Sequence, residues 1–100
     1  MAIEWYWALA HLLARTGTDL DHVFDVVDAW TRGARRVWLR TAVDPATGLT
    51  SLVIWGRTDE GIPLAVFAHR SGRDIEVYNA AYLTADQAAE LQKWEATRND

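Results

Sequence analysis

The sequence predicts an α+β domain with two N-terminal helices, a four-stranded antiparallel meander sheet and a C-terminal helix. Three observations support this prediction. Apolar residues recur at helical spacing before residue 32, they alternate at period two between residues 35 and 79, and a capped helical pattern follows Thr84. Because the chain has 100 residues, half of them apolar, we expect a single domain over residues 1–100.

The first predicted helix covers residues 3–14. Leu9, Leu12 and Leu13 form its apolar stripe, and Gly17 is expected to end it. Thr18 then has the position of an N-cap, with Asp21 three residues later as in a capping box. The second helix follows, ends at Gly33, and is expected to bury one apolar face formed by Leu20, Val23, Phe24, Val27 and Trp30.

Alternation predicts strands at residues 35–43, 49–57, 62–69 and 75–79. Turn residues separate them at 44–48, 58–61 and 71–72. Strands joined by such short turns pair antiparallel, so we expect one sheet face to pack on the helices and the other to face solvent or a ligand. Thr84 and Gln87 form a second capping box, before a helix that turns Leu91 and Trp94 inward.

The composition limits the class of protein. The chain has no cysteine, no basic and apolar leader and no apolar run near the roughly 20 residues of a membrane span, so we expect a cytoplasmic protein without membrane contact. Its net charge of −4 argues against a nucleic-acid binder that uses its whole surface. Nine of the ten basic residues are arginine, however, which suits paired hydrogen bonds to phosphate or carboxylate.

The first strand has a pattern that suits single-stranded RNA. Arg36, Trp38 and Arg40 share one face at period two, which places an aromatic ring between two cations. Trp55 and Arg57 repeat the pattern on the second strand if they share that face. The alternative is an ordinary polar sheet face, with Trp38 packed on arginine side chains.

The turn after the third strand gathers His69, Arg70 and Arg73. Histidine titrates near neutral pH, so His69 is the best candidate for proton transfer, with Arg57, Arg70 and Arg73 as phosphate-binding cations. Arg57 and His69 end neighbouring antiparallel strands at opposite ends, about 20 Å apart, which argues against one compact site. The alternative is a solvated turn.

Several short strings resemble the BrnT family of bacterial toxins, small ribonucleases of the RelE-like group. They are Glu4-Trp5, residues 13–17 (LARTG), Gly56-Arg57-Thr58 and residues 75–84 (IEVYNAAYLT). The resemblance implies a metal-independent endoribonuclease that needs no cofactor. It also implies the toxin of a type II toxin–antitoxin pair, held by a cognate antitoxin, often as a heterotetramer.

The resemblance also carries over individual residues. Arg15 matches a family lysine and becomes a third catalytic candidate beside His69 and Arg57. Thr16 stands at the family histidine, Ala81 at a family arginine, and Glu76 where a basic residue is usual. Such a chain either cleaves RNA with other residues or no longer cleaves it.

A different class of function stays open, because six tryptophans exceed what so small a core can bury. Trp5 and Trp7 point in different directions on the predicted first helix, so at least one of the two should be exposed. The alternative function is therefore a non-catalytic module that binds a partner protein through exposed tryptophans. His22 lies three residues from both Asp19 and Asp25, but with no further convergent ligand we expect no metal site.

Overall fold

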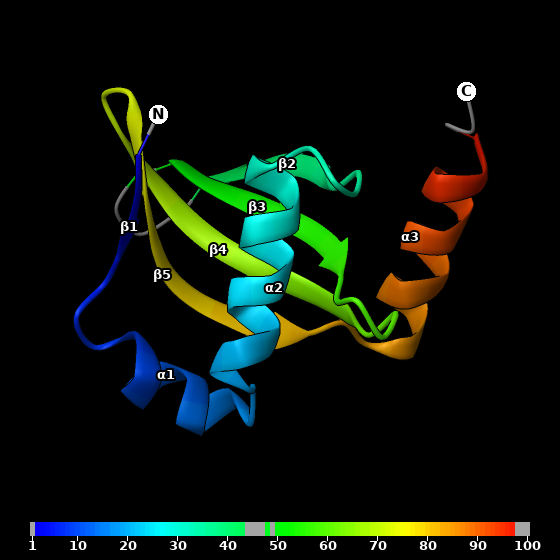
Figure 1. Ribbon diagram of the computed structural model, residues 1–100, viewed down its shortest axis with the longest axis horizontal. Coiled ribbons are helices and arrows are strands. Elements are labelled where there is room, and N and C mark those ends of the chain that lie inside the picture. The colour runs from blue at the N-terminus through cyan, green and yellow to red at the C-terminus, as the bar shows by residue number, and fades with distance from the viewer. Residues whose placement is uncertain (1, 44–47, 49, 98–100) are drawn as a thin grey trace.

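The computed structural model describes residues 2–43, 48 and 50–97. Within these ranges, three helices accompany a five-stranded mixed sheet with the strand order β1-β5-β4-β3-β2 (Figure 1). No helix in these ranges is both long and apolar enough to cross a membrane. The elements in chain order are β1 (Ile3–Trp5), α1 (Leu9–Thr16), α2 (Leu20–Thr31), β2 (Trp38–Val43), β3 (Thr50–Arg57), β4 (Pro63–Ser71), β5 (Asp74–Tyr82) and α3 (Ala85–Thr97).

The predicted four-stranded antiparallel sheet is wrong in one respect, because residues 3–5 form a fifth strand instead of the start of a helix. This strand, β1, runs parallel to β5 with Ile3 opposite Ile75. The free edge of β5 supplies the backbone partners: the Ile75 amide donates to the Ala2 carbonyl (3.0 Å), and the Tyr6 amide donates to the Val77 carbonyl (2.9 Å). Pairing along that edge overrides the helical spacing of the first apolar residues.

The meander itself is confirmed, since β2–β3, β3–β4 and β4–β5 all pair antiparallel. Its strands differ from the predicted ranges by up to three residues, at the start of β2, which begins at Trp38, and at the end of β5, which runs on to Tyr82. A register shift between Phe67 and Ala68 interrupts the β4–β5 ladder. The predicted turn over 44–48 and the start of the second strand at Leu49 lie mostly outside the described residues.

One face of the sheet forms an aliphatic core under α1 and α2. Ile54, Leu64 and Val66 are fully buried there against Val23 and Val26 of α2. The predicted buried face of α2 was partly wrong: Phe24 is 41% exposed, and Val26 is buried in its place. The helix presents residues 23, 26, 27 and 30 toward the sheet, which turns Phe24 outward to meet the ring of Trp5 at 4.7 Å.

Gly56 lets α2 approach the sheet closely. A Cβ atom at this position would lie 2.9 Å from Cγ1 of Val37 and 3.0 Å from Cγ1 of Val26. Real Cβ atoms essentially never come within 3.0 Å of another heavy atom, so the position requires glycine for space.

The connection between α1 and α2 differs from the predicted cap. Gly17 ends α1 in the left-handed conformation, as predicted. The N-cap of α2, however, is Asp19, whose side chain accepts from the Asp21 amide. Thr18 is buried instead, and its hydroxyl and that of Thr16 lie 3.2 and 2.9 Å from the Ala80 carbonyl of β5. These threonines fasten the turn to the sheet.

The third helix corrects the expectation that the helices share one sheet face. Its capping box forms as predicted: Thr84 Oγ1 accepts from the Gln87 amide, and Gln87 Oε1 accepts from the Thr84 amide. Leu91 of α3 is buried against Trp55 and Ala65, whose side chains lie on the face opposite to Ile54 and Leu64. Figure 1 shows α3 well apart from α1 and α2.

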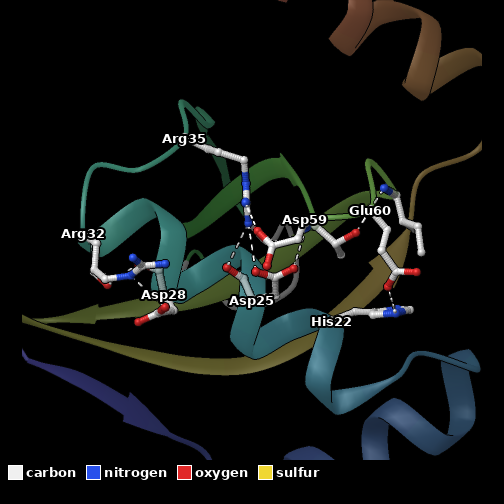
Figure 2. A network of polar contacts seen from close by, with 10 residues as sticks. His22, Asp25, Asp28, Arg32, Arg35, Asp59 and Glu60 are labelled. Carbon is white, nitrogen blue, oxygen red and sulfur yellow. Dashed lines mark hydrogen bonds and ion pairs between the residues drawn. The ribbon is translucent and has the colours of Figure 1, made fainter.

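An ion-pair network fastens α2 to the segments around it (Figure 2). Arg35 bonds to Asp25 of α2 (2.9 Å) and to Asp59 of the β3–β4 turn, and the Asp59 amide donates to Asp25 (2.6 Å). Burial opposes the charge on Asp25, but the Asp59 amide and the Arg35 guanidinium hold the pKa of this carboxyl below its ordinary 3.8. The Asp59 carboxylate in turn raises the pKa of Arg35.

Candidate nucleic-acid interface

The sheet face that carries α3 brings together most of the residues predicted to bind RNA. The strand register arranges this face in rows that cross from β2 to β5. Because alternate residues of a strand share a face, each row presents its side chains on the α3 side. The rows are Trp38–Trp55–Ala65–Ala81, Arg40–Val53–Phe67–Asn79 and Ala42–Ser51–His69–Glu76.

The predicted stripe of Arg36, Trp38 and Arg40 lies on this face, but a helix partly covers it. Trp94 of α3 stacks on Trp38, with ring centroids 5.5 Å apart and planes 3° from parallel. Arg36 lies over the Trp94 ring (5.4 Å) and donates to the Glu95 carbonyl (3.3 Å). The chain's own tryptophan therefore occupies a position where the sequence predicted a nucleic-acid base.

Val37, which precedes β2, and Leu39 within it were predicted to pack on helices. Val37 does so as a half-buried residue against the core. Leu39 does not, since 47% of its surface is exposed.

Arg40 and its neighbours shape an open hollow of about 430 Å³ beside the start of α3. The Arg40 guanidinium lies 4.8 and 4.9 Å from the ring centroids of Trp38 and Trp55, which holds it over aromatic surface. Trp55 is only 6% exposed, so it supports Arg40 and lines the hollow without offering a free ring face. Phe67 and Gln87 also line the hollow.

His69 lies in the row next to Phe67 and is half-buried. Its ring stacks on Tyr78 with centroids 4.0 Å apart, and the Tyr78 hydroxyl lies 3.0 Å from Ser51 Oγ. Glu76 is the cross-strand neighbour of His69 on β5. The face thus combines a histidine, a tyrosine hydroxyl and a carboxylate, three groups that can transfer protons.

Sequence reasoning missed Tyr78 as a partner of His69. The signal was the alternation in β5, which suggests that Glu76 and Tyr78 share a face. The register needed to place them beside His69 depends on the irregularity at Phe67 and Ala68, which the sequence does not mark.

Arg57 lies on the same face but at its other end. Arg57 pairs with Pro63 and His69 with Ser51, so six residues of β3 separate the two positions, about 20 Å. The Arg57 guanidinium donates to both Glu95 carboxylate oxygens (3.0–3.1 Å) and to the Gly61 carbonyl (3.0 Å). These bonds fasten α3 to the sheet and occupy the charge that was predicted to meet phosphate.

The other three predicted cations lie elsewhere. Arg15 is exposed on α1, which packs on the opposite side of the sheet from His69. Arg70 alternates with His69 along β4, so it points to the other face, and Arg73 lies in the β4–β5 turn. Arg70 and Arg73 line a separate hollow of about 330 Å³ at this turn. The structure therefore does not bring the catalytic candidates Arg15, Arg57 and His69 together.

His22 has a structural partner. Its Nδ1 lies 2.8 Å from the Tyr82 hydroxyl, which also accepts from the Asp19 amide (3.1 Å). Among the described residues, no three His, Cys, Asp or Glu side chains are grouped so that they could hold a metal ion.

Comparisons with protein-family models, with curated proteins and with solved structures find no match to this chain.

Proposed function

We propose that this chain is the toxin of a type II toxin–antitoxin pair, a cytoplasmic, metal-independent endoribonuclease that acts on single-stranded RNA at the α3 side of its sheet. One observation carries the proposal: Arg40 and His69 occupy adjacent rows of one sheet face. The Arg40 guanidinium lies over the rings of Trp38 and Trp55, and the His69 ring stacks on Tyr78. A cation for phosphate and groups for proton transfer thus lie within the span of a nucleotide or two. The aromatic ring beside this cation that is half-buried in the hollow is Phe67, and such a ring suits stacking with an RNA base.

In this proposal the reaction is a transfer of the phosphoryl group within RNA. A base removes the proton of a ribose 2′-OH, the 2′ oxygen bonds to the adjacent phosphorus, and the bond to the 5′ oxygen breaks as an acid supplies its proton. His69 serves as one of these groups, and Tyr78 or Glu76 serves as the other. Arg40 stabilises the charge that develops on the phosphate oxygens. The products are a 2′,3′-cyclic phosphate and a 5′-hydroxyl.

The chain departs from the BrnT pattern at Thr16 and Ala81. These departures favour a site formed by Arg40 and His69 over one formed at the family's own positions. Thr16 is engaged with the Ala80 carbonyl and has no group that titrates near neutral pH. Ala81, at the family arginine, lines the hollow beside Arg40. The family position and the proposed site thus lie on the same surface. Arg40 is the cation of this site, and its guanidinium lies 3.9 Å from the exposed Glu90 carboxylate of α3, a pair that a phosphate would have to replace.

The proposal is tested by incubating the purified chain with end-labelled single-stranded RNA in excess chelator. We expect cleavage that leaves cyclic phosphate ends, and a His69→Ala variant that loses about 100-fold or more of the rate. His11→Ala, on the exposed surface of α1, is the matched control and should cleave like the wild type. A His69→Ala variant with full activity, or 5′-phosphate products, would contradict the mechanism.

A second candidate function rests on the exposed tryptophans. Trp7 is 88% exposed, and large exposed aromatic residues often anchor protein partners. The chain would then be a non-catalytic module that binds a protein. If the wild-type chain neither binds nor cleaves RNA in the assay above, while Trp7→Ala abolishes binding to the product of an adjacent gene, this second function replaces the first. The first function has a protein partner as well, because the toxin would be held by its cognate antitoxin in a heterotetramer.

A further inference from the structure

A second concave surface lies on the opposite side of the molecule from the proposed RNA site. It is a groove of about 620 Å³ between β1 and α2. Its apolar lining consists of Ile3 and Trp5 from β1 and Phe24 and Val27 from α2. Neither the proposed cleavage nor the packing of the core accounts for this groove.

The groove exposes aromatic surface that the fold leaves unused. Trp5 is 38% exposed and Phe24 is 41% exposed, although their rings meet edge to face at 4.7 Å. Two adjacent large apolar side chains that stay half in water form the kind of patch that marks an interaction site. Burying the exposed parts of both rings would favour binding of an apolar side chain.

The rim of the groove is acidic, with lining carboxylates from Asp21, Asp25, Asp28 and Asp59. Arg35 neutralises part of this charge through Asp25 and Asp59, and Arg32 pairs with Asp28 (Figure 2). Four carboxylates against two guanidinium groups leave two negative charges. In the described part of the chain, the Asp21 carboxylate has no cationic partner. A ligand that carries lysine or arginine would complement this rim.

The floor of the groove ends at an open sheet edge. In the described ranges β5 is the sole neighbour of β1. Ala2 and Tyr6 direct their hydrogen-bonding groups toward β5, so by alternation the backbone of Ile3 and Trp5 points to the open edge. Such an edge offers unpaired amide and carbonyl groups to an incoming strand.

We propose that this groove binds an extended, basic segment of a partner protein, which adds to β1 as a further strand. One apolar side chain of the segment packs on Trp5 and Phe24, and its lysine or arginine residues face the aspartate rim. Backbone bonds to Ile3 and Trp5 supply affinity, and the apolar contact and the charges supply selectivity. The proposal does not depend on RNA cleavage, because the groove and the proposed RNA site lie on opposite faces of the sheet.

The test is a peptide-display selection on the whole folded chain, followed by synthesis of the selected peptides. We expect enriched sequences that carry lysine or arginine around one aromatic or aliphatic residue. In amide NMR spectra these peptides should shift the signals of residues 3–5 and 21–28, and the amides of Ile3 and Trp5 should gain protection from hydrogen exchange. Enrichment of acidic peptides, or shifts confined to other surfaces, would overturn the proposal.

Two charge-reversal variants sharpen this test. Asp21→Lys, in the first turn of α2, should weaken binding about tenfold or more, because it places like charges together. Asp86→Lys makes the same change in the first turn of α3, outside the groove, and should alter affinity less than about twofold. Equal losses in both variants would show that binding follows net charge alone and would overturn the site. Thermal melts establish that both variants fold.

Discussion

The two faces of the sheet are built from the same strands and differ in almost every other respect. Under α1 and α2, aliphatic side chains such as Ile54 and Val66 are fully buried. Under α3, the neighbouring positions carry tryptophan, arginine and histidine, and the cover is partial. Strand alternation lets one sheet keep these tasks apart, so that polar chemistry on one face does not weaken the core on the other.

The face under α1 and α2 is the closed face of the sheet, and the face under α3 is the open face. The largest effect on stability should come from removing a side chain on the closed face. Ile54→Ala is expected to lower the free energy of unfolding by about 2–5 kcal/mol, because it leaves a cavity in a fully buried site. Val53→Ala, the next residue but on the open face, should cost about 1 kcal/mol or less. Urea unfolding of both variants measures the difference. Equal losses would mean that the open face is packed as tightly as the closed one.

A smaller effect should follow from adding one methyl group on the closed face. Gly56→Ala is expected to cost about 1–3 kcal/mol, because the new Cβ meets Val37 and Val26. In a Val37→Ala background, which removes one of those contacts, the added cost should be lower. Chemical unfolding of the wild type and the three variants of this cycle checks the coupling, and strict additivity would contradict this packing of Gly56 against Val37.

Two ion pairs on α2 offer a further comparison at the rim of the closed face. Asp25→Ala should cost about 1–2 kcal/mol, because it leaves Arg35 and the Asp59 amide without a partner in a half-buried setting. Asp28→Ala breaks the exposed pair with Arg32 and should cost about 0.5 kcal/mol or less. Thermal melts at neutral pH compare the two variants, and a reversed order would show that the network of Figure 2 contributes little.

The smallest expected effect is a dependence on pH. The pKa of Asp25 is lower in the folded chain than its ordinary 3.8, so its charge stabilises the fold fully above that value. The contribution is lost as the pH falls through the lower folded pKa. Asp25→Ala should therefore destabilise the chain less in strong acid than at neutral pH. A stability difference from the wild type that stays constant down to about pH 2 would contradict this assignment.

Local signals in the sequence predicted much of the fold. Gly17 and the Thr84–Gln87 capping box stand where short-range chemistry places them. The meander followed from alternation and turns. The three residues of β1 escaped prediction because a parallel strand depends on a partner far away in the chain, and Ile3 and Trp5 suit a helix equally well.

The sequence also predicted part of the candidate site. Alternation placed Arg36, Trp38 and Arg40 on one face, and strand direction placed Arg57 and His69 at opposite ends. The stacking of Trp94 on Trp38 escaped prediction, because the side of the sheet on which α3 docks is decided by packing. The position of Arg15 on the far side has the same cause, since α1 packs under the other face.

The parallel pairing of β1 also has a consequence for the order of folding. Ala2 and Asp74, which are hydrogen-bonded, lie 72 positions apart in the chain. The β2–β3 and β3–β4 hairpins close short loops and can form early, whereas β1 must wait until its partners at residues 75–77 have emerged during synthesis. We therefore expect β1 to dock last and its long-range pairing to slow the final step of folding.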